Sequence, residues 1–100
     1  MPALLIDPSY AELTDLAGQP VEALVDHGTV SLWLECVSSP VTFDGHTSYS
    51  VRLTGPVQAA LGPGAHVLRT AKGEFMLVLE AVGYDLRYVH YEAFLTEPAA

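Results

Sequence analysis

Hydrophobic and polar residues alternate along most of the chain after residue 20, and this alternation predicts β-strands. Between residues 29 and 38 every second position is apolar, a period typical of a strand with one buried face. The inward positions of this stretch are expected to be Val30, Leu32, Leu34 and Cys36. Residues 39–45 contain Ser-Pro and Asp-Gly pairs and are expected to form a loop. The predicted strands are 21–26, 29–38, 46–54, 65–71, 74–84 and 88–96.

A helical pattern lies ahead of the strands, over residues 9–17. Ser9 is followed three residues later by Glu12, which is the spacing of a capping box. A short apolar stripe occurs at three-residue intervals, formed by Tyr10, Leu13 and Leu16. Gly18 follows, where a glycine commonly ends a helix.

One short helix followed by six short antiparallel strands indicates a mainly β domain, either a small barrel or a two-layer sandwich. We expect a single domain over residues 1–100, with the β region at 20–96 and a frayed tail at 97–100. The strand at 74–84 is apolar at nearly every position from Phe75 to Val82. Such a run is typical of a strand that is covered on both faces.

The charge balance narrows the classes of partner. Twelve acidic and four basic side chains give a formal net charge of −8, and the four basic residues form no run. Nucleic acids and anionic membranes require clustered lysine and arginine, so neither is an expected partner. The amino end has no basic segment followed by a long apolar run. A cytoplasmic protein is therefore expected, and export as part of a larger particle stays open.

The residue types that usually carry catalysis occur without a recognisable catalytic spacing. His90 and Glu92 are two residues apart and project from one face of the last strand, where they would share a metal ion or a proton. The alternative is a structural polar cluster in which Glu92 pairs with Arg52, with Arg69 or with a backbone amide. Cys36 is expected to be a buried, inert thiol. We expect no cofactor and no metal.

Two aromatic or apolar positions are candidates for an interface. Trp33 points to the polar side of its strand, where Glu35 is its neighbour, and an exposed tryptophan is typical of a binding surface. The alternative is that the apolar stripe of the helix covers Trp33. Met76 lies on the second face of the strand at 74–84. For this residue too, the alternatives are an exposed binding surface or a position covered by another element. The candidate interface therefore comprises Trp33, Glu35 and Met76.

Several segments share a pattern with a known family. Residues 49–56 read aromatic-Ser-aliphatic-x-aliphatic-x-Gly-Pro, residues 61–64 read Leu-Gly-Pro-Gly, and residues 91–94 read Tyr-Glu-Ala-Phe. From the short helix to the last strand, the chain resembles a small bacterial family often encoded near phage tail-collar (microcystin-dependent) proteins. The chain departs from that family at Thr54, where an arginine is expected, and at Leu95-Thr96 in place of Phe-Asn. The resemblance implies no activity, and it implies a tail-collar fibre protein as a partner.

We therefore consider three functions, ranked from the most to the least expected. The first is a non-enzymatic binding or assembly accessory protein that docks on a protein partner, or on a second copy of itself, through a strand edge or the Trp33 face. The second is a barrel that holds a small apolar ligand. Its expected lining is Tyr49, Phe75, Tyr91 and Phe94. The third is a metal-dependent or acid–base enzyme that uses His90 and Glu92.

Overall fold

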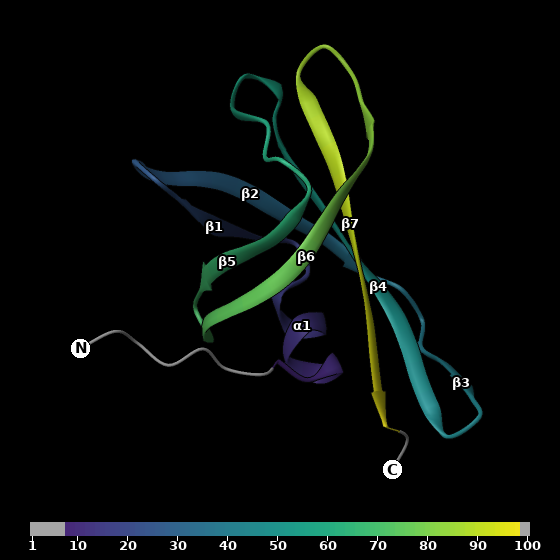
Figure 1. Ribbon diagram of the computed structural model, residues 1–100. Helices are drawn as coiled ribbons and strands as arrows, with labels where there is room; N and C mark the ends of the chain where they lie inside the picture. Colours follow the sequence, from purple (N-terminus) through teal and green to yellow (C-terminus); the bar gives the residue numbers. More distant parts are fainter. Residues whose placement is uncertain (1–7, 99–100) are drawn as a thin grey trace.

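The structure is a computed structural model that describes residues 8–98, and six of its strands close into an antiparallel barrel (Figure 1). The elements in chain order are α1 (Tyr10–Leu16), β1 (Gln19–Val25), β2 (Gly28–Val37), β3 (Val41–Phe43), β4 (His46–Pro56), the short 3₁₀ helix η1 (Val57–Ala59), β5 (Gly64–Thr70), β6 (Gly73–Tyr84) and β7 (Tyr88–Pro98). The mainly β class and the short helix at the front are confirmed.

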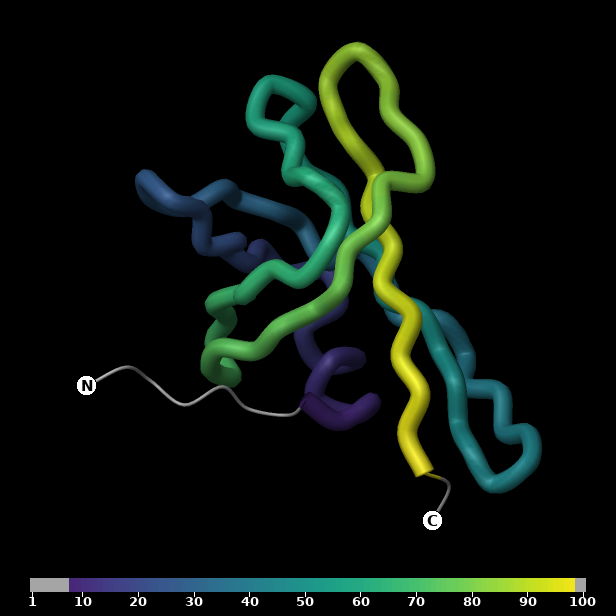
Figure 2. The backbone as a smooth tube through the Cα atoms, in the orientation of Figure 1, coloured from purple at the N-terminus to yellow at the C-terminus, as the bar shows by residue number. Residues whose placement is uncertain are grey.

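The ring of strands runs β2-β1-β5-β6-β7-β4, and it closes because β4 also pairs with β2. Of the two architectures left open by the sequence, the barrel is therefore the one that forms. Pairing around the ring is uneven. β1 and β5 are joined at only two positions, Glu22 with Arg69 and Ala23 with Leu68. β6 pairs with β7 only from Glu80 onwards, so the two strands diverge at one end of the barrel (Figure 2).

The prediction that residues 39–45 form a loop is wrong in part, because Val41–Phe43 form a seventh strand. This strand, β3, makes a hairpin with β4 outside the ring, and Asp44 and Gly45 at its turn both have positive φ. Three residues are too few to show an alternating pattern, which explains why the sequence did not reveal it.

The prediction that the frayed tail begins at residue 97 is also wrong. Glu97 and Pro98 belong to β7 and pair with β4, whereas residues 99–100 lie outside the described part.

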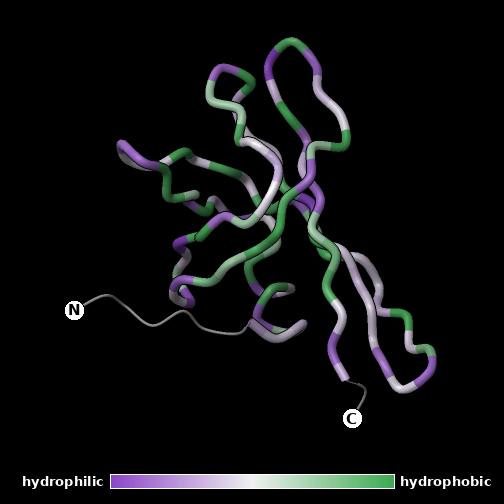
Figure 3. Tube along the Cα trace, viewed as in Figure 1, coloured by the Kyte–Doolittle hydropathy of each residue, from purple (hydrophilic) through white to green (hydrophobic). Residues whose placement is uncertain are grey.

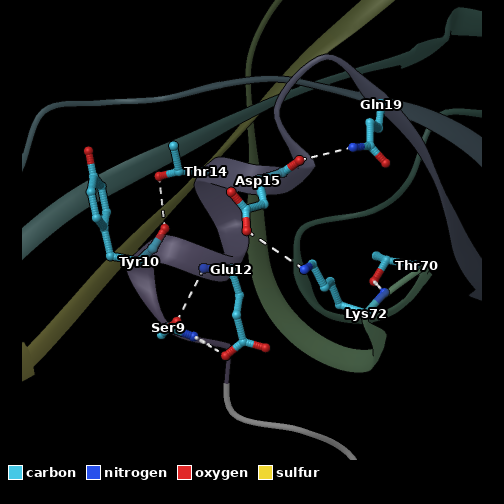
Figure 4. Close-up of polar contacts among 8 residues, drawn as sticks. All are labelled: Ser9, Tyr10, Glu12, Thr14, Asp15, Gln19, Thr70 and Lys72. Atoms are coloured by element: carbon cyan, nitrogen blue, oxygen red, sulfur yellow. Dashed lines mark hydrogen bonds and ion pairs between the residues drawn. The ribbon is translucent and has the colours of Figure 1, made fainter.

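The helix α1 is held by the predicted capping box. The Ser9 hydroxyl accepts a hydrogen bond from the Glu12 amide, and the Glu12 carboxylate accepts one from the Ser9 amide, each at 3.2 Å (Figure 4). Leu13 and Leu16 are buried in the barrel core. Asp15 on the opposite side pairs with Lys72 in the β5–β6 turn at 3.7 Å. The helix therefore covers the end of the barrel where β6 and β7 diverge (Figure 1).

The interior of the barrel is filled by side chains from all six ring strands and α1. Gly55 shows how closely these side chains pack, because a Cβ atom there would lie 2.5 Å from Cδ2 of Leu32. Glycine lets β4 continue past the bulk of Leu32 and Tyr91 at this point. The fully buried large side chains include Tyr91, Phe75, Leu13, Leu16, Leu34, Leu53, Leu68 and Leu79.

The expectation that residues 74–84 are covered on both faces is wrong. Phe75, Leu77 and Leu79 of β6 point into the core, whereas Met76 and Val78 are 51% and 66% exposed. In an antiparallel barrel the outer face of each strand meets solvent unless another layer covers it. Apolar segments consequently appear outside the core as well, including at the projecting β6–β7 and β3–β4 hairpins (Figure 3).

Candidate interaction face

The outer surface of β2, β4 and β7 brings together side chains that are far apart in the sequence. Trp33 on β2 is the register partner of Thr54 on β4, and Thr54 is in turn the partner of His90 on β7. These three residues form one row across the sheet. Trp33 is 47% exposed. The alternative that α1 covers Trp33 is therefore wrong, because the helix buries its stripe in the end of the barrel instead.

A depression of about 400 Å³ lies on this row. Its lining residues are Trp33, Glu35, Thr54, Tyr88 and His90. A second depression, of about 230 Å³, adjoins it and shares Trp33, Thr54 and Tyr88 with it. We call the two depressions the Trp33–Tyr88 groove. Trp33 and Tyr88 are each about half exposed, so both aromatic side chains are available to a partner.

A β-bulge in β2 sets the position of Glu35 in this groove. Leu34 pairs with Leu53 and Cys36 pairs with the adjacent Arg52, so Glu35 is an extra residue on its strand. The Thr54 hydroxyl donates a hydrogen bond to the Glu35 carboxylate, which holds that carboxylate over the groove. Because the bulge shifts the alternation, Cys36 is exposed. The prediction of a buried thiol is therefore wrong.

The turn before β7 adds a second carboxylate beside the groove. Oδ1 of Asp85 accepts hydrogen bonds from the backbone amides of Arg87 at 2.7 Å and Tyr88 at 2.8 Å. These bonds lower the pKa of Asp85 below its ordinary value because they favour the ionised form. Oδ2 of the same side chain lies 3.8 Å from Nε2 of His90. Asp85 thus orders the turn that positions Tyr88 and His90.

Substituting Asp85 by alanine is expected to destabilise this turn in a pH-dependent way. The folded-state pKa is lowered, so the contribution of the carboxylate to stability is present above the ordinary aspartate pKa of about 4 and is lost as the pH falls through the lowered value. We expect the urea midpoint of Asp85→Ala to lie below that of the wild type at pH 7, and the gap to shrink at pH 3. An equal gap at both pH values would show that the carboxylate charge is not involved.

The polar cluster expected around Glu92 lies next to the groove. Nη2 of Arg52 on β4 and Oε2 of Glu92 on β7 are 2.7 Å apart, and the two residues are register partners. The hydrogen bond to Glu92 raises the pKa of Arg52. Glu80 on β6 is the register partner of Glu92 on its other side. Arg52 is thus engaged by Glu92, which is the structural alternative considered from the sequence.

The structure separates other residues that the sequence grouped. Met76 lies on β6, which is three strands from β2 in either direction around the six-stranded ring. Trp33, Glu35 and Met76 therefore do not form one interface, and Met76 belongs to a different surface with Val78. His90 and Glu92 share a face of β7, but His90 lies toward Asp85 and Glu92 toward Arg52. Within residues 8–98, no three histidine, cysteine or acidic side chains gather as ligands for a metal ion.

The lining expected for an interior ligand is also not brought together. Tyr49, Phe75 and Tyr91 are buried in the core, whereas Phe94 is 72% exposed on the outer face of β7. The inclusion of Phe94 is wrong because it follows the buried Ala93 and so points outwards. The residues that the sequence did not single out are Thr54 and Tyr88, which line the groove, and Asp85, which lies beside it. Asp85 stands three residues before Tyr88, the aromatic residue that begins β7. An aspartate at such a position indicates a turn, and this was the one sequence feature that pointed to the role of Asp85.

No protein-family model, curated protein or solved structure matches this chain. Among the described residues, none of the helices is long and apolar enough to cross a membrane.

Proposed function

We propose that this protein is a non-enzymatic binding module that attaches to a protein partner through the outer face of β2, β4 and β7. The observation that carries the proposal is the exposure of Trp33 and Tyr88 in one groove on the outer wall of the barrel. Tryptophan and tyrosine are enriched among the residues that dominate binding energy at protein interfaces. Trp33 lies on β2 and Tyr88 on β7, on either side of β4, and their exposure on strands of one sheet supports recognition by preformed side chains.

Contact at this face would be made by side chains and not by adding a strand. β2 is paired with β1 from Gly28 to Leu34 and with β4 from Trp33 to Val37, and β4 is paired with β7 on its second edge. The backbone groups next to Trp33 and Thr54 are therefore already used within the barrel. The strand-edge mode of docking would require a different place, such as β3, for which pairing is described only with β4. The family resemblance suggests a tail-collar fibre protein as the partner to test first.

The test is capture of the tail-collar fibre protein by the tagged full chain, with variants compared side by side. Trp33→Ala is expected to weaken binding at least about tenfold, because truncating a central aromatic anchor removes much of the interface energy. Met76→Ala is the matched control, since Met76 has a similar exposed fraction but lies on the opposite side of the barrel. Circular dichroism would show that both variants remain folded.

Equal loss of capture in both variants, or in neither, would contradict this use of the Trp33 face. A second copy of the chain is the alternative partner. Sedimentation velocity separates the two cases, because self-association through the groove predicts a dimer that Trp33→Ala dissociates at the same protein concentration.

A further inference from the structure

The Trp33–Tyr88 groove combines aromatic surface with negative charge. Its larger depression is lined by two aromatic side chains, one carboxylate, the Thr54 hydroxyl and His90. The smaller one adds the Ser31 hydroxyl and a mainly apolar wall, and neither depression is lined by a lysine or an arginine. The face of an aromatic ring carries partial negative charge and attracts cations, most strongly for tryptophan. The larger depression, which contains Glu35, is therefore suited to a positively charged group, and the smaller one to an apolar stem that carries it.

The charges around the groove point in the same direction. Glu35 is exposed and held in place by Thr54, and Asp85 lies beside His90 at the other wall. Arg52, two residues before Thr54 on β4, forms a 2.7 Å ion pair with Glu92. The whole chain carries a formal charge of −8, so a basic partner is also attracted at long range.

We infer that the Trp33–Tyr88 groove binds the cationic head of a lysine or arginine side chain presented by the protein partner. This inference rests on the proposed function and adds the chemistry of recognition. The ammonium or guanidinium group would lie against the rings of Trp33 and Tyr88 and face the carboxylate of Glu35. Arginine suits this arrangement well, because its planar head stacks on aromatic rings while it donates hydrogen bonds to a carboxylate.

A titration with small peptides tests the inference without the natural partner. The probes are acetylated Gly-Arg-Gly and Gly-Lys-Gly amides, and the control is the same peptide with citrulline, which has nearly the shape of arginine and no charge. Amide and indole NMR signals of the labelled full chain are followed. We expect saturable shifts centred on the Trp33 indole and the Tyr88 amide, with millimolar affinity for the charged peptides and about tenfold weaker binding of the citrulline peptide.

Two variants assign the effect to the groove. Glu35→Gln removes the carboxylate charge without changing the shape of the side chain, and it is expected to weaken binding of the arginine peptide by about fivefold to tenfold. Glu97→Gln is the control, because it makes the same charge change at the far end of β7. Added salt should weaken binding to the wild type more than binding to Glu35→Gln.

The possible results separate this inference from the proposed function. Equal binding of arginine and citrulline peptides, shifts centred away from the groove, or no shifts with any probe would each overturn the cation site. The proposed function is judged independently by the effect of Trp33→Ala on capture of the fibre protein. If the partner makes only a neutral apolar contact with the groove, Trp33→Ala would lose capture of the fibre protein and Glu35→Gln would retain it.

Discussion

Replacing Tyr91 with alanine is expected to reduce the free energy of unfolding by about 3–5 kcal/mol, as is typical when a large buried aromatic side chain is removed. Tyr91 is 1% exposed, and its Cε2 atom would lie 3.4 Å from a Cβ atom placed on Gly55. Domains of this size are commonly stable by only about 5–15 kcal/mol, so the loss would leave a substantial unfolded population. Urea unfolding followed by circular dichroism measures the effect directly.

The hydroxyl and the ring of Tyr91 have separable roles. Its hydroxyl oxygen accepts a hydrogen bond from the Leu61 amide at 2.9 Å, which ties the segment after η1 to the barrel. Tyr91→Phe keeps the ring and is expected to cost only about 1 kcal/mol. Phe94→Ala is the surface control on the same strand, with an expected change within about 0.5 kcal/mol. A similar loss for Tyr91→Ala and Phe94→Ala would contradict the inward placement of Tyr91.

Replacing Leu13 with alanine in α1 is expected to destabilise the protein by about 2–5 kcal/mol, and Leu16→Ala by a similar amount. Both side chains are buried in the core although the helix has only seven residues. So short a helix has little stability of its own and depends on this packing. Loss of the contact should therefore release the helix and expose the end of the barrel. Binding of a hydrophobic dye at low urea concentration would report that exposure.

The surface of the same helix provides the comparison. Asp15 is largely exposed, and its 3.7 Å pair with Lys72 joins two solvated side chains. Exposed pairs of this kind contribute little, so Asp15→Ala is expected to change stability by less than about 1 kcal/mol. If Leu13→Ala were as stable as Asp15→Ala, the helix would not be part of the core.

Local spacing was sufficient to predict the helix and the six ring strands. The Ser9–Glu12 capping pair and the leucines after it specify a short amphipathic turn of helix, whatever lies further along the chain. The alternation in 29–38 correctly placed Leu32 and Leu34 in the core. Both patterns depend on the geometry of one element, which the sequence of that element controls.

Features that depend on two distant segments could not be predicted in the same way. Closure of the barrel requires residues 33–37 to pair with residues 51–54, and alternation does not identify the partner of a strand. The Trp33–Tyr88 groove depends on this pairing, because it forms where β2, β4 and β7 lie side by side. For the same reason, the sequence grouped Met76 with Trp33, although the ring places them on opposite sides.

The bulge at Glu35 makes one place in β2 tolerant of a change in chain length. Inward residues occupy even positions up to Leu34, and the next inward position is Val37. If one residue were deleted at the bulge, regular alternation would be restored and Val37 would still face the core. A deletion within a regular part of a strand would instead turn every later side chain to the opposite face. Gaps of one residue in an alignment of related sequences should therefore concentrate at positions 35 and 36.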